Sequence, residues 1–161
     1  MGKLYVHIQF NDMLFFISIK SGTIVVLTQG RQAGKKAVVV KVFDDGTKTR
    51  PFGHALVMGI EKAPLSVTKK MSQKKTEKRQ RVKPFAQFVN YNHIIPTRYT
   101  LPADLDCKLW ISEQQMETPE GRTTAKMALK TLLKDKFKAI PADKSGKPLK
   151  DLVFLKTKLR F

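Results

Sequence analysis

The stretch KSGTIVVLTQGRQAGKKAVVVKVFDDG, residues 20–46, contains two runs of β-branched residues on either side of a glycine-containing loop. The runs are residues 23–28 and 37–43, and branched side chains favour strands because they pack well on a pleated surface. The sequence Asp44-Asp45-Gly46 ends the second run in a typical turn. The stretch therefore predicts a strand–loop–strand unit, in which the glycines supply positive φ angles or a close backbone approach.

Two further runs extend this pattern along the chain. Residues 54–60 follow the turn-like sequence RPFG, and residues 84–90 are a further strand candidate. Short strands at close spacing with tight turns are typical of small barrels. We therefore expect a mainly β fold with one small barrel over residues 20–100, because 161 residues fit one ordinary domain with extensions.

Residues 4–19 precede this unit and form the most apolar part of the chain. Their longest unbroken apolar run, residues 13–17, has five residues, whereas a membrane span needs about twenty and the core of a signal peptide about seven to fifteen. We therefore expect neither. The alternation of Leu4, Val6, Ile8 and Phe10 predicts a hairpin or an edge strand instead.

The charge balance indicates the class of partner. Thirty-one Lys and Arg residues stand against thirteen Asp and Glu, which gives a net charge of +18 and a pI near 10.2. Nucleic acid is the leading candidate, because phosphate neutralisation with counterion release rewards such a surplus. An anionic membrane surface is the second candidate, and it requires an amphipathic or apolar anchor.

Residues 69–83 concentrate the charge, with eight cationic side chains and one acid, Glu77. A charge run of this kind is either a solvated helix face, a disordered arm or a phosphate-binding element. We favour phosphate contact, since the surplus cations repel one another without a counter-surface. The segment is expected to form a basic helical insertion in the barrel.

The C-terminal part has a different composition. Thr118 is a candidate N-cap with Pro119 at the first helical position, which predicts a helix over about residues 119–140. One face of it carries Lys126, Lys130 and Lys134 and ends at Lys138. Residues 152–161 are expected to form an extended basic-aromatic tail. The apolar positions at helical spacing are Ala125, Ala128, Leu129, Leu132, Leu133, Phe137 and Ile140.

Catalytic and metal chemistry find little support. The single cysteine, Cys107, fits a reducing compartment, and with three histidines it offers no metal-ligand spacing. The loop GRQAGKK has three residues between its glycines and Lys36 after Lys35, so it lacks the spacing and the hydroxyl of a nucleotide-binding P-loop. No nucleophile elbow or acid pair accompanies His54 or His93. We expect no enzyme activity, no cofactor and no small-molecule substrate.

Residues 20–46 resemble a KOW motif, the strand–loop–strand unit of small SH3-like barrels in ribosomal and transcription-elongation proteins. The blocks RPFGHALVMGIEKAP (residues 50–64), VNYNHIIPTRYT (89–100) and KLRF (158–161) resemble the eukaryotic, e-type ribosomal protein twenty-seven family of the large subunit. The resemblance implies an SH3-like (KOW) barrel with a C-terminal helix and tail, and a structural role in the large subunit. It also implies ribosomal RNA and neighbouring ribosomal proteins as partners, a cytosolic ribosome and assembly in the nucleolus.

The resemblance and the charge pattern together give the candidate site residues. Gly30 and Gly34 are the expected structural glycines of the loop. The candidate RNA-binding residues are Arg31, Lys35 and Lys36 in the loop, Lys69, Lys70, Lys74, Lys75, Lys78, Arg79, Arg81 and Lys83 in the insertion, Asn92, His93, Arg98 and Tyr99 after it, and Lys158 and Arg160 in the tail.

The stretch YNHIIPTRYT, residues 91–100, fits RNA contact on chemical grounds. It offers Arg, aromatic rings and an amide, and no acid lies between Glu77 and Asp104. RNA presents phosphates, splayed bases and 2′-hydroxyls, which those side chains bind and a carboxylate repels. Pro96 restricts Ile95 to extended conformations, so we expect an extended segment.

The sequence departs from the family pattern in two places. Residues 4–19 stand where family members pass directly into the KSG-like start, as a lineage-specific extension or as an intron read as coding sequence, and we expect them to be dispensable for the barrel. Residues 101–121, with Trp110, also depart, so no contacts are carried over to them. The alternative function is a KOW-domain factor in transcription or RNA processing, which the KLRF ending and the lack of further KOW repeats disfavour.

Overall fold

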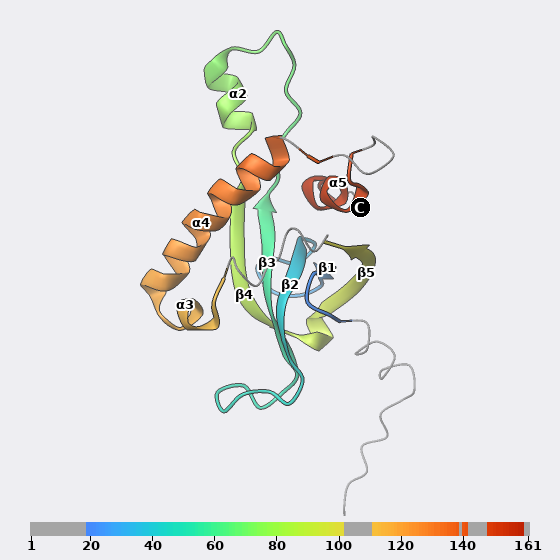
Figure 1. Ribbon diagram of the computed structural model, residues 1–161, viewed down its shortest axis with the longest axis vertical. Helices are drawn as coiled ribbons and strands as arrows, with labels where there is room; N and C mark the ends of the chain where they lie inside the picture. Colours follow the sequence, from blue (N-terminus) through green and yellow to red (C-terminus); the bar gives the residue numbers. More distant parts are fainter. Residues whose placement is uncertain (1–18, 102–110, 139, 142–147, 160–161) are drawn as a thin grey trace, which may run out of the picture.

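The computed structural model describes residues 19–101, 111–138, 140–141 and 148–159 (Figure 1). Five strands form one sheet in the order β4-β3-β2-β1-β5, and every neighbouring pair is antiparallel. The predicted strands are confirmed, and the sheet has a fifth member. The strands are β1 (Thr23–Leu27), β2 (Lys36–Phe43), β3 (His54–Lys62), β4 (Lys83–Asn90) and β5 (Ile94–Thr100).

The prediction of a mainly β chain is wrong in its proportions. The described helices, α2 (Gln73–Arg79), α3 (Glu113–Glu117), α4 (Pro119–Lys138) and α5 (Lys150–Lys156), hold slightly more residues than the strands. The chain is therefore mixed, with a five-stranded antiparallel sheet followed by helices. The additional helical residues lie in the C-terminal part, where α3 and α5 were not predicted.

The sheet is buried on both faces, with neighbouring residues of each strand pointing to opposite sides. In β2, Val38 and Val40 belong to one apolar cluster, whereas Ala37 and Val39 belong to the other. The first cluster also contains residues of α3, α4 and α5, so the helices cover that face. Burial on both faces explains why β1, β2 and β3 are apolar at successive positions.

Helix α4 is the main cover and begins as predicted. The backbone N–H of Gly121 donates to Thr118 Oγ1 at 3.1 Å, and Pro119 is the first helical residue. In Figure 1 the helix crosses β4 obliquely. The side chains on its inner face are buried. These buried residues are Ala125, Leu129, Leu133 and Phe137, whereas Ala128 of the predicted face is exposed.

The predicted extended tail is wrong for residues 152–156, which belong to α5 (Lys150–Lys156). Leu152 and Leu155 are each 2% exposed and pack into the same apolar cluster as α4. Residues three apart share a face of a helix, whereas in an extended strand they point to opposite sides. Burial of both leucines against one surface therefore favours the helix over the extended form.

Several predictions fall on parts of the chain outside the described residues. These include the hairpin or edge strand expected within residues 4–18, Cys107, Trp110 and Arg160. Ile19, however, is only 5% exposed and packs with Val25 and Ile94. Ile19 therefore belongs to the core, and the dispensability of residues 4–19 for the barrel stays a prediction.

Within the described residues, no helix combines the length and the apolar character that crossing a membrane requires. The longest of these helices, α4, carries lysines along its exposed face and apolar residues along its buried one, so it is a surface cover of the sheet.

Replacing Leu129 with Ala is expected to destabilise the fold by about 2–5 kcal/mol, because the side chain is completely buried between α4 and the sheet. Met127→Ala is the matched control on the same helix, since Met127 is 69% exposed, and it is expected to cost under about 0.5 kcal/mol. Urea denaturation followed by circular dichroism measures both. Equal effects of the two substitutions would show that α4 does not pack on the sheet.

Candidate nucleic-acid interface

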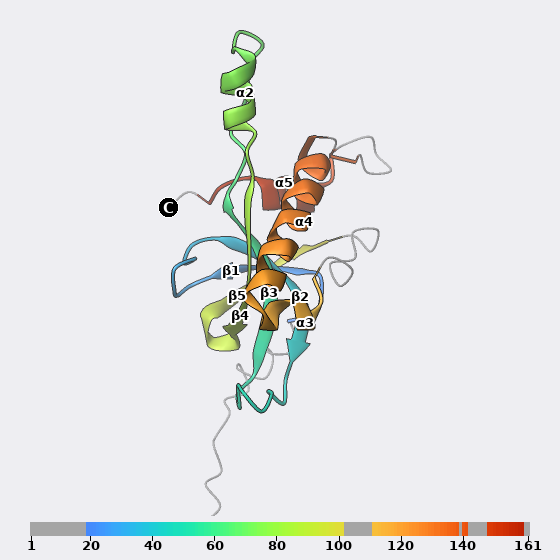
Figure 2. The same cartoon turned by 90° about the vertical axis from the view of Figure 1, so that its left-hand side faces the viewer.

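The connection between β3 and β4, residues 63–82, projects from the sheet, and we call it the basic arm (Figures 1 and 2). Helix α2 confirms the predicted helical form for part of the insertion. The helix contains no buried residue, so it contributes nothing to the core. The base of the arm is closed by two hydrogen bonds. Leu65 N–H donates to the Arg79 carbonyl at 2.9 Å, and Arg79 Nε donates to the Ser66 carbonyl at 2.9 Å.

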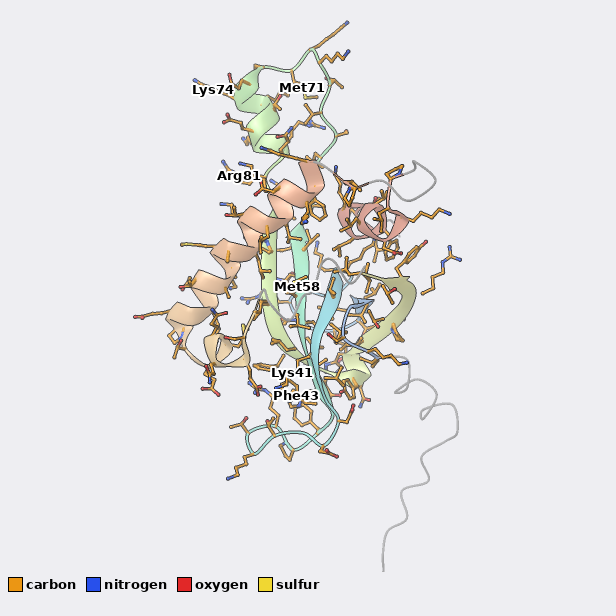
Figure 3. The ribbon with its side chains drawn as sticks, viewed as in Figure 1. Lys41, Phe43, Met58, Met71, Lys74 and Arg81 are labelled. Atoms are coloured by element: carbon orange, nitrogen blue, oxygen red, sulfur yellow. The ribbon has the colours of Figure 1, made fainter. Side chains whose placement is uncertain are left out.

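The cations of the arm face solvent. Lys74 lies near its tip and Arg81 near its base in Figure 3, and Glu77 is the one acid between residues 69 and 83. Lys83 already belongs to β4, where its ammonium group pairs with Glu61 at 2.9 Å. The exposed cationic side chains of the arm are Lys69, Lys70, Lys74, Lys75, Lys78 and Arg81.

The loop between β1 and β2 holds the predicted glycines in the left-handed region. Gly30 has a φ of 85° and Gly34 a φ of 70°, which a residue with a Cβ adopts only with strain. Gly34 N–H donates to the Leu27 carbonyl at 2.7 Å, and this closes the loop. Arg31 is exposed and Lys35 half-buried, so both are accessible beside the loop.

Lys36 lies elsewhere, inside the fold. It is 6% exposed, and its Nζ donates to the carbonyls of Phe154 at 2.5 Å and Thr157 at 2.7 Å. The same ammonium group lies 3.7 Å from the centre of the Phe154 ring. Burial lowers the pKa of Lys36, and the two carbonyls bind its charged form. The ammonium group of Lys36 therefore anchors α5, and its burial keeps it away from phosphates at the protein surface.

Arg98 and Tyr99 lie on the edge strand β5, next to the contact between Lys36 and Phe154. The Tyr99 ring stacks on Phe154 with centroids 4.1 Å apart, and the Arg98 guanidinium lies 5.2 Å from the Tyr99 ring centre. Arg98 Nη2 donates to the Tyr99 hydroxyl at 3.2 Å, which raises the pKa of the fully exposed guanidinium. The four groups form one stack, with Lys36 at its inner end and Arg98 at its outer end.

The segment expected to be extended is a strand that belongs to the sheet. Residues 94–100 form β5 and pair with β1, with Val26 opposite Ile95. Asn92 and His93 lie in the single turn of 3-10 helix before it, where Asn92 N–H donates to the Asn90 side chain. Asn92 and Arg98 are exposed and His93 is half-buried, so the turn and β5 present two polar side chains and one cation to solvent.

A groove brings three of the predicted residues together. Lys35, Lys36 and Lys158 line it beside the base of the basic arm, the last turns of α4 and the end of α5. Four further lysines at the same place were not predicted, because β3, α4 and α5 approach one another only in the fold. They are Lys62, Lys134, Lys138 and Lys156. The helical lysine spacing on α4 was visible in the sequence, but not the partner elements.

Among the described histidines, His54 is a packed core side chain. His54 is completely buried, stacks on Phe43 with centroids 4.8 Å apart, and shares a hydrogen bond with the Phe52 carbonyl. No group of three or more metal-ligating side chains occurs among the described residues. The ion pairs between described residues join Lys41 to Glu113 and Lys83 to Glu61, so neither involves Arg98.

Comparison with known proteins identifies the family. The model of the Ribosomal L27e protein family matches residues 24–154. The large ribosomal subunit protein eL27 of Pyrobotrys stellatus is 53% identical over 120 residues, which cover 74% of this chain and 87% of that protein. The protein of the same name from Candida albicans is 50% identical over 121 residues, 75% of this chain and 88% of its own length.

The similarity to the eL27 protein of Tetrahymena thermophila extends further, with 45% identity over 144 residues that cover 89% of this chain and 97% of that protein. The family match spans the sheet, the basic arm and most of the C-terminal helices. These matches confirm the resemblance seen in the sequence, and the chain belongs to the Ribosomal L27e protein family.

Proposed function

We propose that this chain is a structural constituent of the large ribosomal subunit that binds and stabilises ribosomal RNA. Its relatives carry the name of a large ribosomal subunit protein, which supports a structural and non-enzymatic role. The observation that carries the RNA-binding part is the basic arm. Its helix has no buried residue, so its side chains are free to meet a partner.

Charge repulsion raises the free energy of the arm when no polyanion is bound. Six exposed cations within thirteen residues, 69–81, repel one another, and Glu77 is the single acid among them. Phosphate groups remove this repulsion, and the release of their counterions adds to the binding free energy. The projection of the arm away from the sheet suits insertion between RNA segments (Figure 2).

The edge strand β5 supplies a second contact of a different kind. The Arg98 guanidinium is held beside the Tyr99 ring, and the hydrogen bond to the hydroxyl limits its rotation. A planar guanidinium can bridge two phosphate oxygens or stack on an unpaired base. Asn92, His93 and the loop residue Arg31 are further proposed contacts outside the arm.

Further parts of the proposal follow from the family resemblance. The sheet order is proposed to be that of an SH3-like barrel, with residues 20–46 as its KOW unit. The proposed partners are large-subunit ribosomal RNA and neighbouring ribosomal proteins, without a membrane or a small-molecule substrate. The proposed location is the cytosolic ribosome, after assembly in the nucleolus.

Replacing the arm lysines Lys70, Lys74, Lys75 and Lys78 together with Gln is expected to weaken binding to large-subunit ribosomal RNA by about tenfold or more at low salt. Arg79 is kept, because its side chain closes the base of the arm. The thermal midpoint is expected to change by only a few degrees, since the four side chains are exposed. Filter binding and circular dichroism measure the two quantities.

The matched control removes the same charge elsewhere. Lys48, Lys126, Lys130 and Lys150 are exposed lysines outside the arm, and their joint replacement with Gln is expected to weaken binding much less. Equal losses for both variants would show that net charge alone, and not the arm, determines the affinity.

Arg98→Glu is expected to reduce incorporation into large subunits and to leave the free protein folded, because the side chain is exposed and lies beside the Tyr99 ring. Arg98→Lys is expected to give a milder defect, because lysine keeps the positive charge and loses only the planar contact that a guanidinium forms. The measurement is the share of each variant in sedimented large subunits. Arg122→Glu on α4 is the control with the same charge change, and a defect as large as that of Arg98→Glu would refute the assignment.

The logarithm of the RNA affinity is expected to fall linearly with the logarithm of the salt concentration, by about 0.7 to 0.9 per neutralised phosphate. The slope is measured by titration at about 50 to 300 mM potassium chloride, a range in which salt increasingly screens the interactions between charges. A slope near zero would contradict phosphate neutralisation as the main source of affinity.

A further inference from the structure

The groove at the base of the basic arm has a composition that the general attraction to phosphates does not explain. It lies where residues 63–67 of the arm, the C-terminal turns of α4 and the end of α5 approach one another, and this half-open groove has a volume of about 900 Å³. This volume falls within the range of about 300–1,000 Å³ of pockets that hold small organic molecules. It therefore has room for a nucleotide.

The rim of the groove is strongly positive. Lys36 and Lys156 donate to backbone carbonyls, whereas the other five lysines have no acidic partner within 4 Å among the described residues. The one acid of the groove, Glu61, already pairs with Lys83. The five lysines with uncompensated charge are Lys35, Lys62, Lys134, Lys138 and Lys158.

The inside of the groove is apolar, in contrast to its rim. Leu65 is 53% exposed and Val67 38% exposed, and both are among the few large apolar side chains that face solvent in the described residues. They lie beside Pro64 and above the buried Phe137 and Leu155, which also line the groove. Exposed apolar surface surrounded by charge is typical of a site for a specific partner.

We propose that this groove takes an unpaired nucleotide of single-stranded RNA, with its phosphates on the lysine rim and its base against Leu65 and Val67. Bases that leave a helix are commonly held between apolar or aromatic side chains, while their phosphates contact lysines. The inference rests on the proposed RNA-binding function and adds a site that distinguishes a base from the backbone. An acidic protein segment with apolar side chains has a similar complementarity, and the experiment separates it.

The walls of the groove are fixed by contacts already described. Lys36 holds the carbonyls of Phe154 and Thr157, and Lys156 Nζ donates to the Phe137 carbonyl at 3.0 Å, which joins α5 to the end of α4. The arm side is set by the hydrogen bonds between Arg79 and residues 65–66. Hydrogen bonds within the chain therefore fix the positions of the groove walls.

The test compares two probes with the full chain. One is a fluorescein-labelled decauridylate, and the other is an abasic chain of the same length, with the same phosphates and no bases. At 0.1 M salt the unchanged protein is expected to bind the decauridylate about fivefold more tightly in fluorescence anisotropy, because burial of the apolar base face against Leu65 and Val67 adds to phosphate binding. Equal affinities for the two probes would overturn the inference.

Leu65→Ser with Val67→Ser is expected to remove the preference for bases and to leave the affinity for the abasic chain unchanged. Met127→Ser with Val153→Ser is the matched control, since these residues are 69% and 38% exposed and lie outside the groove. The control is expected to keep the preference. Circular dichroism of both variants confirms that each is folded.

Replacing Lys134 and Lys138 with Gln is expected to weaken both probes by the same factor, about three- to tenfold. The same change at Lys126 and Lys130, on α4 outside the groove, is expected to have a smaller effect. Equal effects of the two pairs would overturn the assignment of the rim.

The failures of the two proposals are distinguishable. Salt-insensitive or absent binding of both probes contradicts RNA binding itself. Salt-dependent binding with a base preference that survives Leu65→Ser with Val67→Ser overturns the groove alone and moves the base contact elsewhere. Binding of a ten-residue peptide of alternating Glu and Leu, lost in that variant while the decauridylate shows no preference, replaces RNA with a protein partner and overturns the inference.

Discussion

The burial of the sheet on both faces is the constraint on which the rest of the structure depends. The central strands β2 and β3 carry apolar side chains at successive positions, and an apolar face left in water costs about 25 cal/mol for each Å². One face closes with Ile19, Tyr91 and Ile94, and the other requires the helices after β5. The C-terminal helices are therefore part of the core of the fold, because the sheet without them leaves one apolar face in water.

The same constraint determines where the charge of +18 can go. With both faces of the sheet covered, the cations occupy the arm, the exposed side of α4 and the ends of the strands. Lys36 is the exception, and its burial is tolerated because two carbonyls and an aromatic ring surround the ammonium group. A buried cation costs free energy unless such groups compensate it, so Lys36 also fixes the position of α5. The surface charge and the internal anchor are thus two uses of the same residue type.

Much of the sheet could be predicted from the sequence, because β-branched runs and turn residues are local signals. The start of α4 was predicted for the same reason, since Thr118 and Pro119 act within one turn. Helix α5 was missed because its two buried leucines gain their partners from α4 and the sheet, far away in the sequence. The role of Lys36 was missed for a related reason, since a lysine beside a glycine loop looks like a phosphate contact until Phe154 lies over it. Local chemistry predicts the arm and Arg98 as contacts, whereas the groove arises from three elements that only the fold brings together.

The contact between Lys36 and Phe154 spans 118 positions of the chain, which has a consequence for the newly made protein. At a synthesis rate of about 5–20 residues per second, roughly 6 to 24 seconds separate the appearance of these two residues. During that interval β2 and β3 can pair, but the face that α4 and α5 cover is open to water and to other chains. The growing chain is therefore most prone to aggregation after β5 has been made and before α4 follows, when the sheet exists without its main cover.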